Sequence, residues 1–75
     1  MLCLLDLTEG DKFLVSSITA PAVIKNRLFE LGLREKEIIV LKKFSYFKSS
    51  VLLRVNGFNL CLGKRIASNI YGFKV

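Results

Sequence analysis

Near the N-terminus the hydrophobic residues follow first the period of a strand and then that of a helix. Residues 12–19 come after the turn signal of residues 9–11 and are rich in β-branched and aromatic residues, so they predict a strand. The alternation is imperfect, because Ile18 falls on the opposite face from Phe13 and Val15. Either a bulge or burial of both faces would explain this pattern.

The next segment predicts a helix over residues 21–31. Pro21 suits the first helical position, with Thr19 or Ala20 before it as the cap. An apolar stripe with helical spacing follows, made of Ile24, Leu28 and Leu31. Gly32 stands where a helix commonly ends in a left-handed residue.

The middle of the chain predicts strands. Residues 38–44 form one, and Asn56-Gly57 is the preferred pair for a type I′ turn in a hairpin. This turn sets a register in which Val55 opposes Phe58, Leu53 opposes Leu60 and Val51 opposes Leu62. These six side chains share one face, which we expect to point inward. The other face carries Leu52, Arg54, Asn59 and Cys61.

The C-terminal residues predict a short helical turn within 63–70 and a terminal strand at 72–75. With one helix among several short strands, the expected fold is mainly β. It is a small, partly open barrel of about five strands, with one helix after the first strand and a short helical turn before the last. We expect residues 1–75 to form a single domain.

The residue types argue against an enzyme. The chain has no His, no Trp and six carboxylates, which removes most groups used in acid–base catalysis, nucleophilic triads and transition-metal ligation. We therefore expect no catalytic residue and no cofactor. The chain lacks a recognisable signal peptide and a long apolar run, and its two cysteines, Cys3 and Cys61, make no disulfide framework. These features predict a cytoplasmic protein with reduced thiols.

Charge is distributed unevenly along the chain. Residues 1–41 hold five basic and six acidic side chains, whereas residues 42–75 hold seven basic side chains and no acidic one. This asymmetry fits an acidic protein partner, a nucleic acid or an anionic membrane surface. It fits equally well basic side chains that only keep the domain soluble.

Aromatic residues interleave with lysines between positions 42 and 48. The aromatic residues are Phe44, Tyr46 and Phe47, and the lysines are Lys42, Lys43 and Lys48. Such a cluster can stack on bases and contact phosphates, or anchor an acidic protein. The alternative is that Phe44 and Phe47 turn inward to close the barrel, which leaves Tyr46 and the lysines in solvent.

An ordered set of motifs resembles the FeoA-like family. Residues 27–33, Arg-Leu-Phe-Glu-Leu-Gly-Leu, match its R-L-x-x-L-G-L signature. Residues 4–10, with Leu4 or Leu5 first, match L-x-x-L-x-x-G, residues 55–62 match V-x-G-x-x-x-x-L, and residues 67–70 match A-x-x-I. The resemblance spans nearly the whole chain, and its elements come in the predicted order.

The resemblance implies an SH3-like barrel and a small cytoplasmic accessory protein of bacterial ferrous-iron uptake. Its implied partner is the membrane transporter FeoB, whose cytoplasmic part is a G-protein-like GTPase. A related domain also occurs at the C-terminus of some metal-dependent repressors. Because ferrous sites favour His and carboxylate ligands, which this chain lacks or does not cluster, we predict no stoichiometric metal site. Any role in iron transport then acts through protein contacts.

Three segments depart from the family pattern. Glu35-Lys36 replace a usual Pro-Gly, Leu62-Gly63 replace a frequent Leu-Arg, and residues 44–50 replace a loop that normally contains prolines and a Gly-Asp pair. The chain therefore resembles a divergent member of the family.

Three functions fit these observations. The leading one is an interaction module that docks on the cytoplasmic part of a FeoB-type transporter. The alternative is a basic small barrel that binds nucleic acid, with an affinity that falls steeply with salt. The third is self-association through exposed strand edges. The candidate partner-binding residues are Arg27, Lys42, Lys43, Tyr46, Phe47, Lys48, Lys64 and Arg65.

Overall fold

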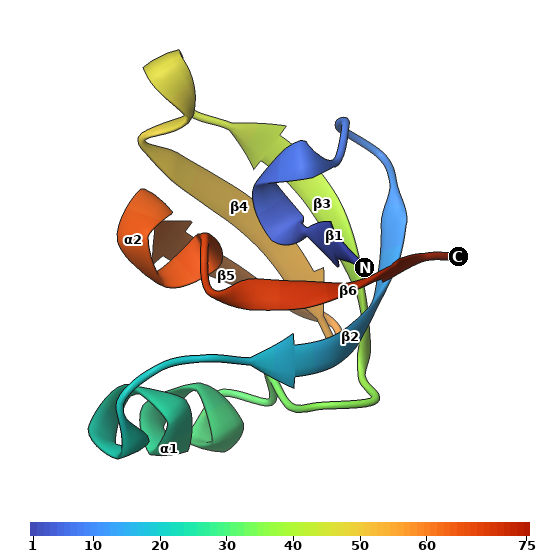
Figure 1. The fold of residues 1–75 in the computed structure, drawn as a ribbon. Coiled ribbons are helices and arrows are strands. Elements are labelled where there is room, and N and C mark those ends of the chain that lie inside the picture. The colour runs from blue at the N-terminus through green and yellow to red at the C-terminus, as the bar shows by residue number, and fades with distance from the viewer.

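One antiparallel sheet organises the molecule. In the computed structural model of residues 1–75, six strands are joined in the order β1-β6-β2-β3-β4-β5 (Figure 1). The strands are β1 (Leu2–Cys3), β2 (Lys12–Ile18), β3 (Ile38–Phe44), β4 (Ser50–Val55), β5 (Phe58–Gly63) and β6 (Ile70–Lys74). β1 and β5 are both edge strands, so the sheet curls without closing. The predicted partly open, mainly β barrel is confirmed, with β1 as an additional strand.

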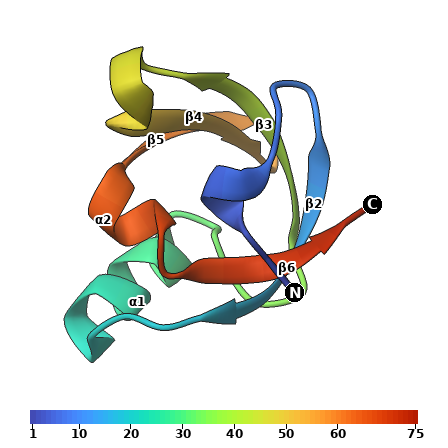
Figure 2. The same ribbon diagram turned by 45° about the horizontal axis from the view of Figure 1, so that its top comes forward.

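Four helical segments connect these strands. They are the 3₁₀ helices η1 (Leu4–Asp6) and η2 (Tyr46–Lys48) and the α-helices α1 (Ala22–Glu30) and α2 (Lys64–Ala67). Figure 2 shows α1 and α2 next to each other at one side of the curled sheet, and η1 across the opening between β6 and the β3–β4 strands. The long helix follows the first long strand, and the short helix precedes the last strand, as predicted.

A register shift in β2 resolves the broken alternation of the first predicted strand. Pairing of β2 with β6 shifts between Val15 and Ser17. The extra residue returns Ile18 to the core side, where it is buried together with Phe13 and Val15. Of the two explanations that the pattern left open, the bulge is the correct one.

The hairpin has the predicted register. Val51 pairs with Leu62, Leu53 with Leu60 and Val55 with Phe58, and φ is 50° at Asn56 and 83° at Gly57, as a type I′ turn requires. The expectation that all six side chains point into the core is wrong for Phe58, which is 72% exposed. It lies on the edge strand next to the turn, beyond the part of the face that other elements cover.

Helix α1 begins one residue later than predicted, because Pro21 is its N-cap, with ψ of 150°, and not its first helical residue. The amide groups of Gly32 and Leu33 donate to the carbonyls of Phe29 and Leu28, at 3.1 and 2.9 Å. With φ of 93° at Gly32, this is a Schellman motif.

Only one residue of the helical stripe is fully buried. Leu28 and, beyond the helix, Leu33 belong to the core of 15 hydrophobic residues, and Ile24 packs against it from a half-buried position. Leu31, the third residue of the stripe, is 43% exposed. It lies at the C-cap of α1 and lines a surface groove.

A hydrogen-bonded turn ties the start of β2 to the end of β6. The carboxylate of Asp11 accepts bonds from the amide and the hydroxyl of Thr8, both at 2.9 Å, and lies 3.4 Å from Nζ of Lys74. These interactions, led by the Thr8 amide, lower the pKa of the Asp11 carboxyl.

Candidate interaction surfaces

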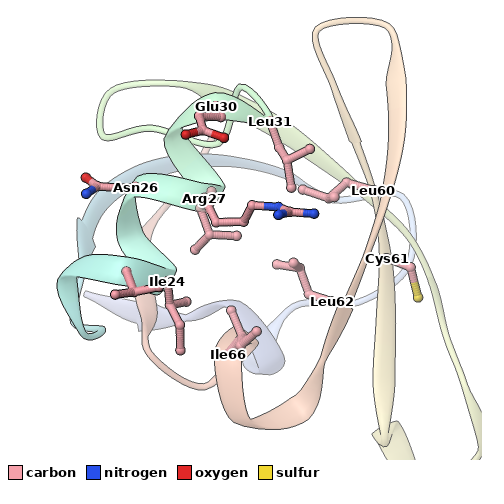
Figure 3. A pocket seen from close by; sticks show the side chains of 11 residues that line it. Ile24, Asn26, Arg27, Glu30, Leu31, Leu60, Cys61, Leu62 and Ile66 are labelled. Atoms are coloured by element: carbon pink, nitrogen blue, oxygen red, sulfur yellow. The ribbon is translucent and has the colours of Figure 1, made fainter.

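An apolar groove separates α1 from the edge strand β5, with α2 at one end. It has a volume of about 570 Å³. Figure 3 shows that Ile24 and Leu31 from α1 and its C-cap face Leu60 and Leu62 from β5 and Ile66 from α2. Concave, mostly apolar sites with a few polar groups are typical of ligand or peptide recognition.

Arg27 is the cation of this groove. Its side chain extends from α1 across the groove toward Leu60 and Leu62 (Figure 3). Its guanidinium has no acidic partner, because the one ion pair in the structure joins Lys74 to Asp11. Arg27 is therefore available to a carboxylate of a bound partner, and a planar guanidinium can bind a carboxylate through two parallel hydrogen bonds.

The segment between β3 and β4 forms a second surface, which we call the aromatic tip (residues 45–49). It projects from the opposite end of the molecule from α1 (Figure 1). Tyr46 is 90% and Phe47 95% exposed. The expectation that Phe44 and Phe47 both turn inward holds for Phe44 alone, which packs against the core.

Lys48 is fixed at the base of the aromatic tip. Its Nζ lies 4.8 Å from the centre of the Phe44 ring and 3.4 Å from the carbonyl oxygen of Leu5. These contacts combine a cation–π interaction with a hydrogen bond.

The remaining candidate cations surround this end of the sheet. Lys42 and Lys43 are exposed at the end of β3, and Lys64 and Arg65 are exposed at the start of α2. The amide of Lys64 donates to the carbonyl of Ser49 at 3.0 Å, which brings α2 next to the tip. The structure thus groups seven of the eight candidate residues around the tip and places Arg27 in the groove.

The groove walls on β5 and α2 were not among the predicted site residues. Leu60 and Leu62 were expected to point inward, yet both line the groove, together with Ile66 of α2. No sequence signal places α1 opposite β5, because these segments are distant in the chain and meet only in the folded sheet.

The structure holds no group of three or more His, Cys, Asp or Glu side chains that could bind a metal ion. Both cysteines are free. The Sγ atom of Cys3 lies 3.5 Å from the carbonyl oxygen of Ser68, whereas Cys61 is exposed on β5 and is one of the residues that line the groove. Neither α-helix is long and apolar enough to cross a membrane.

Comparison with known proteins places this arrangement in a family. The FeoA domain matches residues 2–72, so the chain belongs to the FeoA family, which is associated with ferrous-iron uptake. This is a family of accessory proteins and not a known enzyme family. The resemblance found in the sequence motifs is thereby confirmed. A comparison with curated proteins gives no match.

Solved structures share the fold. The FeoA protein from Chlorobium tepidum is 26% identical with a TM-score of 0.87, over 93% of this chain and 67% of that one. An iron uptake regulatory protein (FeoA) is 22% identical with a TM-score of 0.85, over 99% of this chain and 96% of that one. ScaR, solved with bound Cd²⁺, is 23% identical with a TM-score of 0.88, and the match covers all of this chain and 35% of ScaR.

Proposed function

We propose that residues 1–75 form one cytoplasmic domain that docks on the cytoplasmic part of a FeoB-type ferrous-iron transporter. The observation that carries this proposal is the FeoA family match over residues 2–72. The structure supports a binding role, because it offers an apolar groove with an unpaired cation. Such a domain acts on iron uptake through contact with the transporter.

The side chains that line the groove determine which kind of segment it can bind. Its walls are mostly aliphatic, Asn26 and Glu30 also line it, and Arg27 is the one basic group, which extends across it. The groove therefore fits a helix or an extended segment that presents apolar side chains together with one carboxylate. Pairing with Arg27 fixes the orientation of that segment, while the apolar contacts supply most of the affinity.

The basic residues near the aromatic tip have a different part in this proposal. Long-range attraction raises the rate at which the domain meets an acidic partner, even where the charges make no direct contact. The steering residues are Lys42, Lys43, Lys48, Lys64 and Arg65. Replacement of Lys42, Lys43 and Lys48 by Glu should therefore slow association and weaken docking.

The first prediction concerns the groove. Isotopically labelled domain is titrated with the cytoplasmic GTPase region of the transporter from the same cell, with nucleotide present, and amide shifts are followed by NMR. We expect localised shifts in α1, β5 and α2. The double variant Arg27→Gln/Leu31→Ser should bind at least about tenfold more weakly, since it removes an ion pair and an apolar contact worth about 1 kcal/mol each.

A second double variant serves as the control, because it removes one positive charge and one exposed apolar side chain outside the groove. Lys25 lies on the same helix outside the groove, and Ile38 is 51% exposed at the start of β3, close to the exposure of Leu31. Lys25→Gln/Ile38→Ser should leave the affinity unchanged within about twofold. Equal losses in both double variants would contradict docking through the groove. Absence of binding to the GTPase region and to the membrane part alike would overturn the docking role.

A further inference from the structure

The aromatic tip has a chemistry that the groove does not use. We infer that this tip inserts Tyr46 and Phe47 into the headgroup region of an anionic lipid bilayer. This inference goes beyond the proposed docking function and does not depend on it, because it concerns lipid alone. It rests on the exposure, backbone and charge of residues 42–49 and on the start of α2.

The two aromatic side chains have no partner in the folded chain. Tyr46 and Phe47 are the most exposed large hydrophobic residues of the molecule. Phe47 and Lys48 both adopt left-handed backbone conformations, with φ of 56° and 54°. A bulky residue pays a steric penalty there, so local structure must hold the chain in this shape.

That local structure is a set of hydrogen bonds within the tip. The hydroxyl groups of Ser45 and Ser49 are 2.8 Å apart, and the amide of Ser50 donates to Oγ of Ser45 at 2.8 Å. The amide of Lys48 donates to the carbonyl of Ser45 at 3.0 Å. The aromatic side chains are thus presented outward on a preformed support, which lowers the entropy lost on binding.

Cations dominate the surroundings of the tip. Lys42 and Lys43 end β3, Lys48 lies at the tip, and Lys64 is held beside it through the bond to Ser49. The nearby carboxylates are those of Glu9, which accepts a bond from the Phe44 amide at 3.2 Å, and Asp6, which accepts one from the Cys3 amide at 3.2 Å.

Exposed aromatic side chains with several lysines nearby match the chemistry of an anionic bilayer surface. Tyr and other amphipathic aromatic side chains concentrate at the membrane–water interface. Lysines at the surface are attracted by anionic headgroups over about a Debye length.

The same geometry favours lipid over nucleic acid. Proteins that bind single strands place aromatic rings along a groove that follows the backbone, so that successive bases can stack. Here the two rings lie on a projecting tip, and no residue from 42 to 50 lines any of the three cavities of the structure. A tip suits insertion into a fluid layer, which needs no complementary groove.

Because the chain contains no tryptophan, the fluorescence of a single introduced tryptophan reports on one site alone. Phe47→Trp places the only indole at the tip. The matched control is Phe58→Trp, which places the indole on an exposed site beside Val55, at the end of β4 that is remote from the tip. Each variant is titrated with vesicles of phosphatidylcholine and phosphatidylglycerol, with and without bromine-labelled acyl chains. We expect a blue shift and quenching by the brominated chains for Phe47→Trp, and neither for Phe58→Trp.

Charge variants in the Phe47→Trp background test the lysines. Lys42→Gln/Lys43→Gln should lower the partition coefficient by about 25-fold, since each lysine near an anionic surface contributes about fivefold. The control Lys25→Gln/Lys36→Gln removes the same charge from exposed sites far from the tip and should change it by less than about twofold.

Three results would overturn the inference. One is an unchanged spectrum of Phe47→Trp with anionic vesicles, and another is equal insertion of both indoles. The third is quenching of Phe47→Trp by a single-stranded oligonucleotide without any response to vesicles, which would assign the tip to nucleic acid. Because the vesicles contain no transporter, each outcome is independent of docking through the groove.

Discussion

Gly72 lies in β6, where it pairs with both Leu2 of β1 and Val15 of β2. A Cβ atom at this position would lie 1.9 Å from the carbonyl oxygen of Leu14 and 2.9 Å from the ring of Phe13. No side-chain movement relieves the first contact, because the oxygen belongs to the backbone. The close approach of β6 to β2 therefore requires glycine.

Gly72→Ala should lower the free energy of unfolding by about 3 kcal/mol, the scale of severe overpacking in a core. Gly63→Ala is the matched control, since a Cβ there meets nothing within 4 Å and φ is −69°. It should stay within about 0.5 kcal/mol of the parent. Urea denaturation of both variants measures the difference, and similar stabilities would show that the two strands can separate at little cost.

Single residues also show where sequence reasoning reaches its limit. Phe44 and Phe47 have the same side chain and stand three positions apart, yet one packs on the core and the other is almost fully exposed. The difference arises from the left-handed backbone at Phe47. Nothing in a run of aromatic and basic residues marks that conformation, because it depends on the serine hydrogen bonds that close the tip.

At the scale of elements, α1 is attached to the sheet through few contacts. Leu28 is the one fully buried residue of the helix, while its neighbours Val23 and Phe29 are exposed. The Schellman motif at Gly32 then directs Leu33 into the core.

Leu28→Ala should therefore cost about 3 kcal/mol of unfolding free energy, from lost burial and the cavity it leaves. Val23→Ala, at a side chain that is 80% exposed, should change stability by less than about 0.5 kcal/mol. Thermal or urea unfolding compares the two. A small effect of Leu28→Ala would mean that the groove between α1 and β5 can collapse onto the missing side chain.

Elements with a strong local signal were predicted well. The strand at 38–44 and the register of the 56–57 hairpin agree with the structure, because β-branched runs and an Asn-Gly turn act over a few neighbouring residues. The two-residue strand β1 was not predicted, because only its pairing with β6 makes it a strand. Pro21 was predicted as the first helical residue but is the N-cap, because sequence signals locate a helix end only to within one or two residues.

At the scale of the whole molecule, the two candidate surfaces are distinct but both involve α2, because Ile66 lines the groove and the amide of Lys64 bonds to Ser49 of the tip. The groove lies beside α1, whereas the aromatic tip projects from the opposite end of the sheet (Figure 1). No residue of the aromatic tip lines the groove, so we expect substitutions in the two surfaces to have additive effects.

We therefore expect substitutions in one surface to weaken one binding activity and to leave the other unchanged. Arg27→Gln/Leu31→Ser should weaken binding to the GTPase region and leave vesicle binding unchanged, whereas Tyr46→Ser/Phe47→Ser should abolish vesicle binding and leave affinity for the GTPase region within about twofold. Both assays on both variants provide the measurement. If either of these two double variants impaired both activities, the groove and the tip would form one continuous interface.

The sequence by itself determined the β-rich class, the helix and its glycine stop, the hairpin register, the family and the excess of basic residues after position 41. These properties depend on local periodicity, turn chemistry and composition. The tertiary structure alone decided that the β2 bulge buries Ile18, that α1 and β5 enclose a groove around Arg27, and that Tyr46 and Phe47 project while Phe44 does not. Such outcomes require contacts between distant segments, which no local pattern encodes.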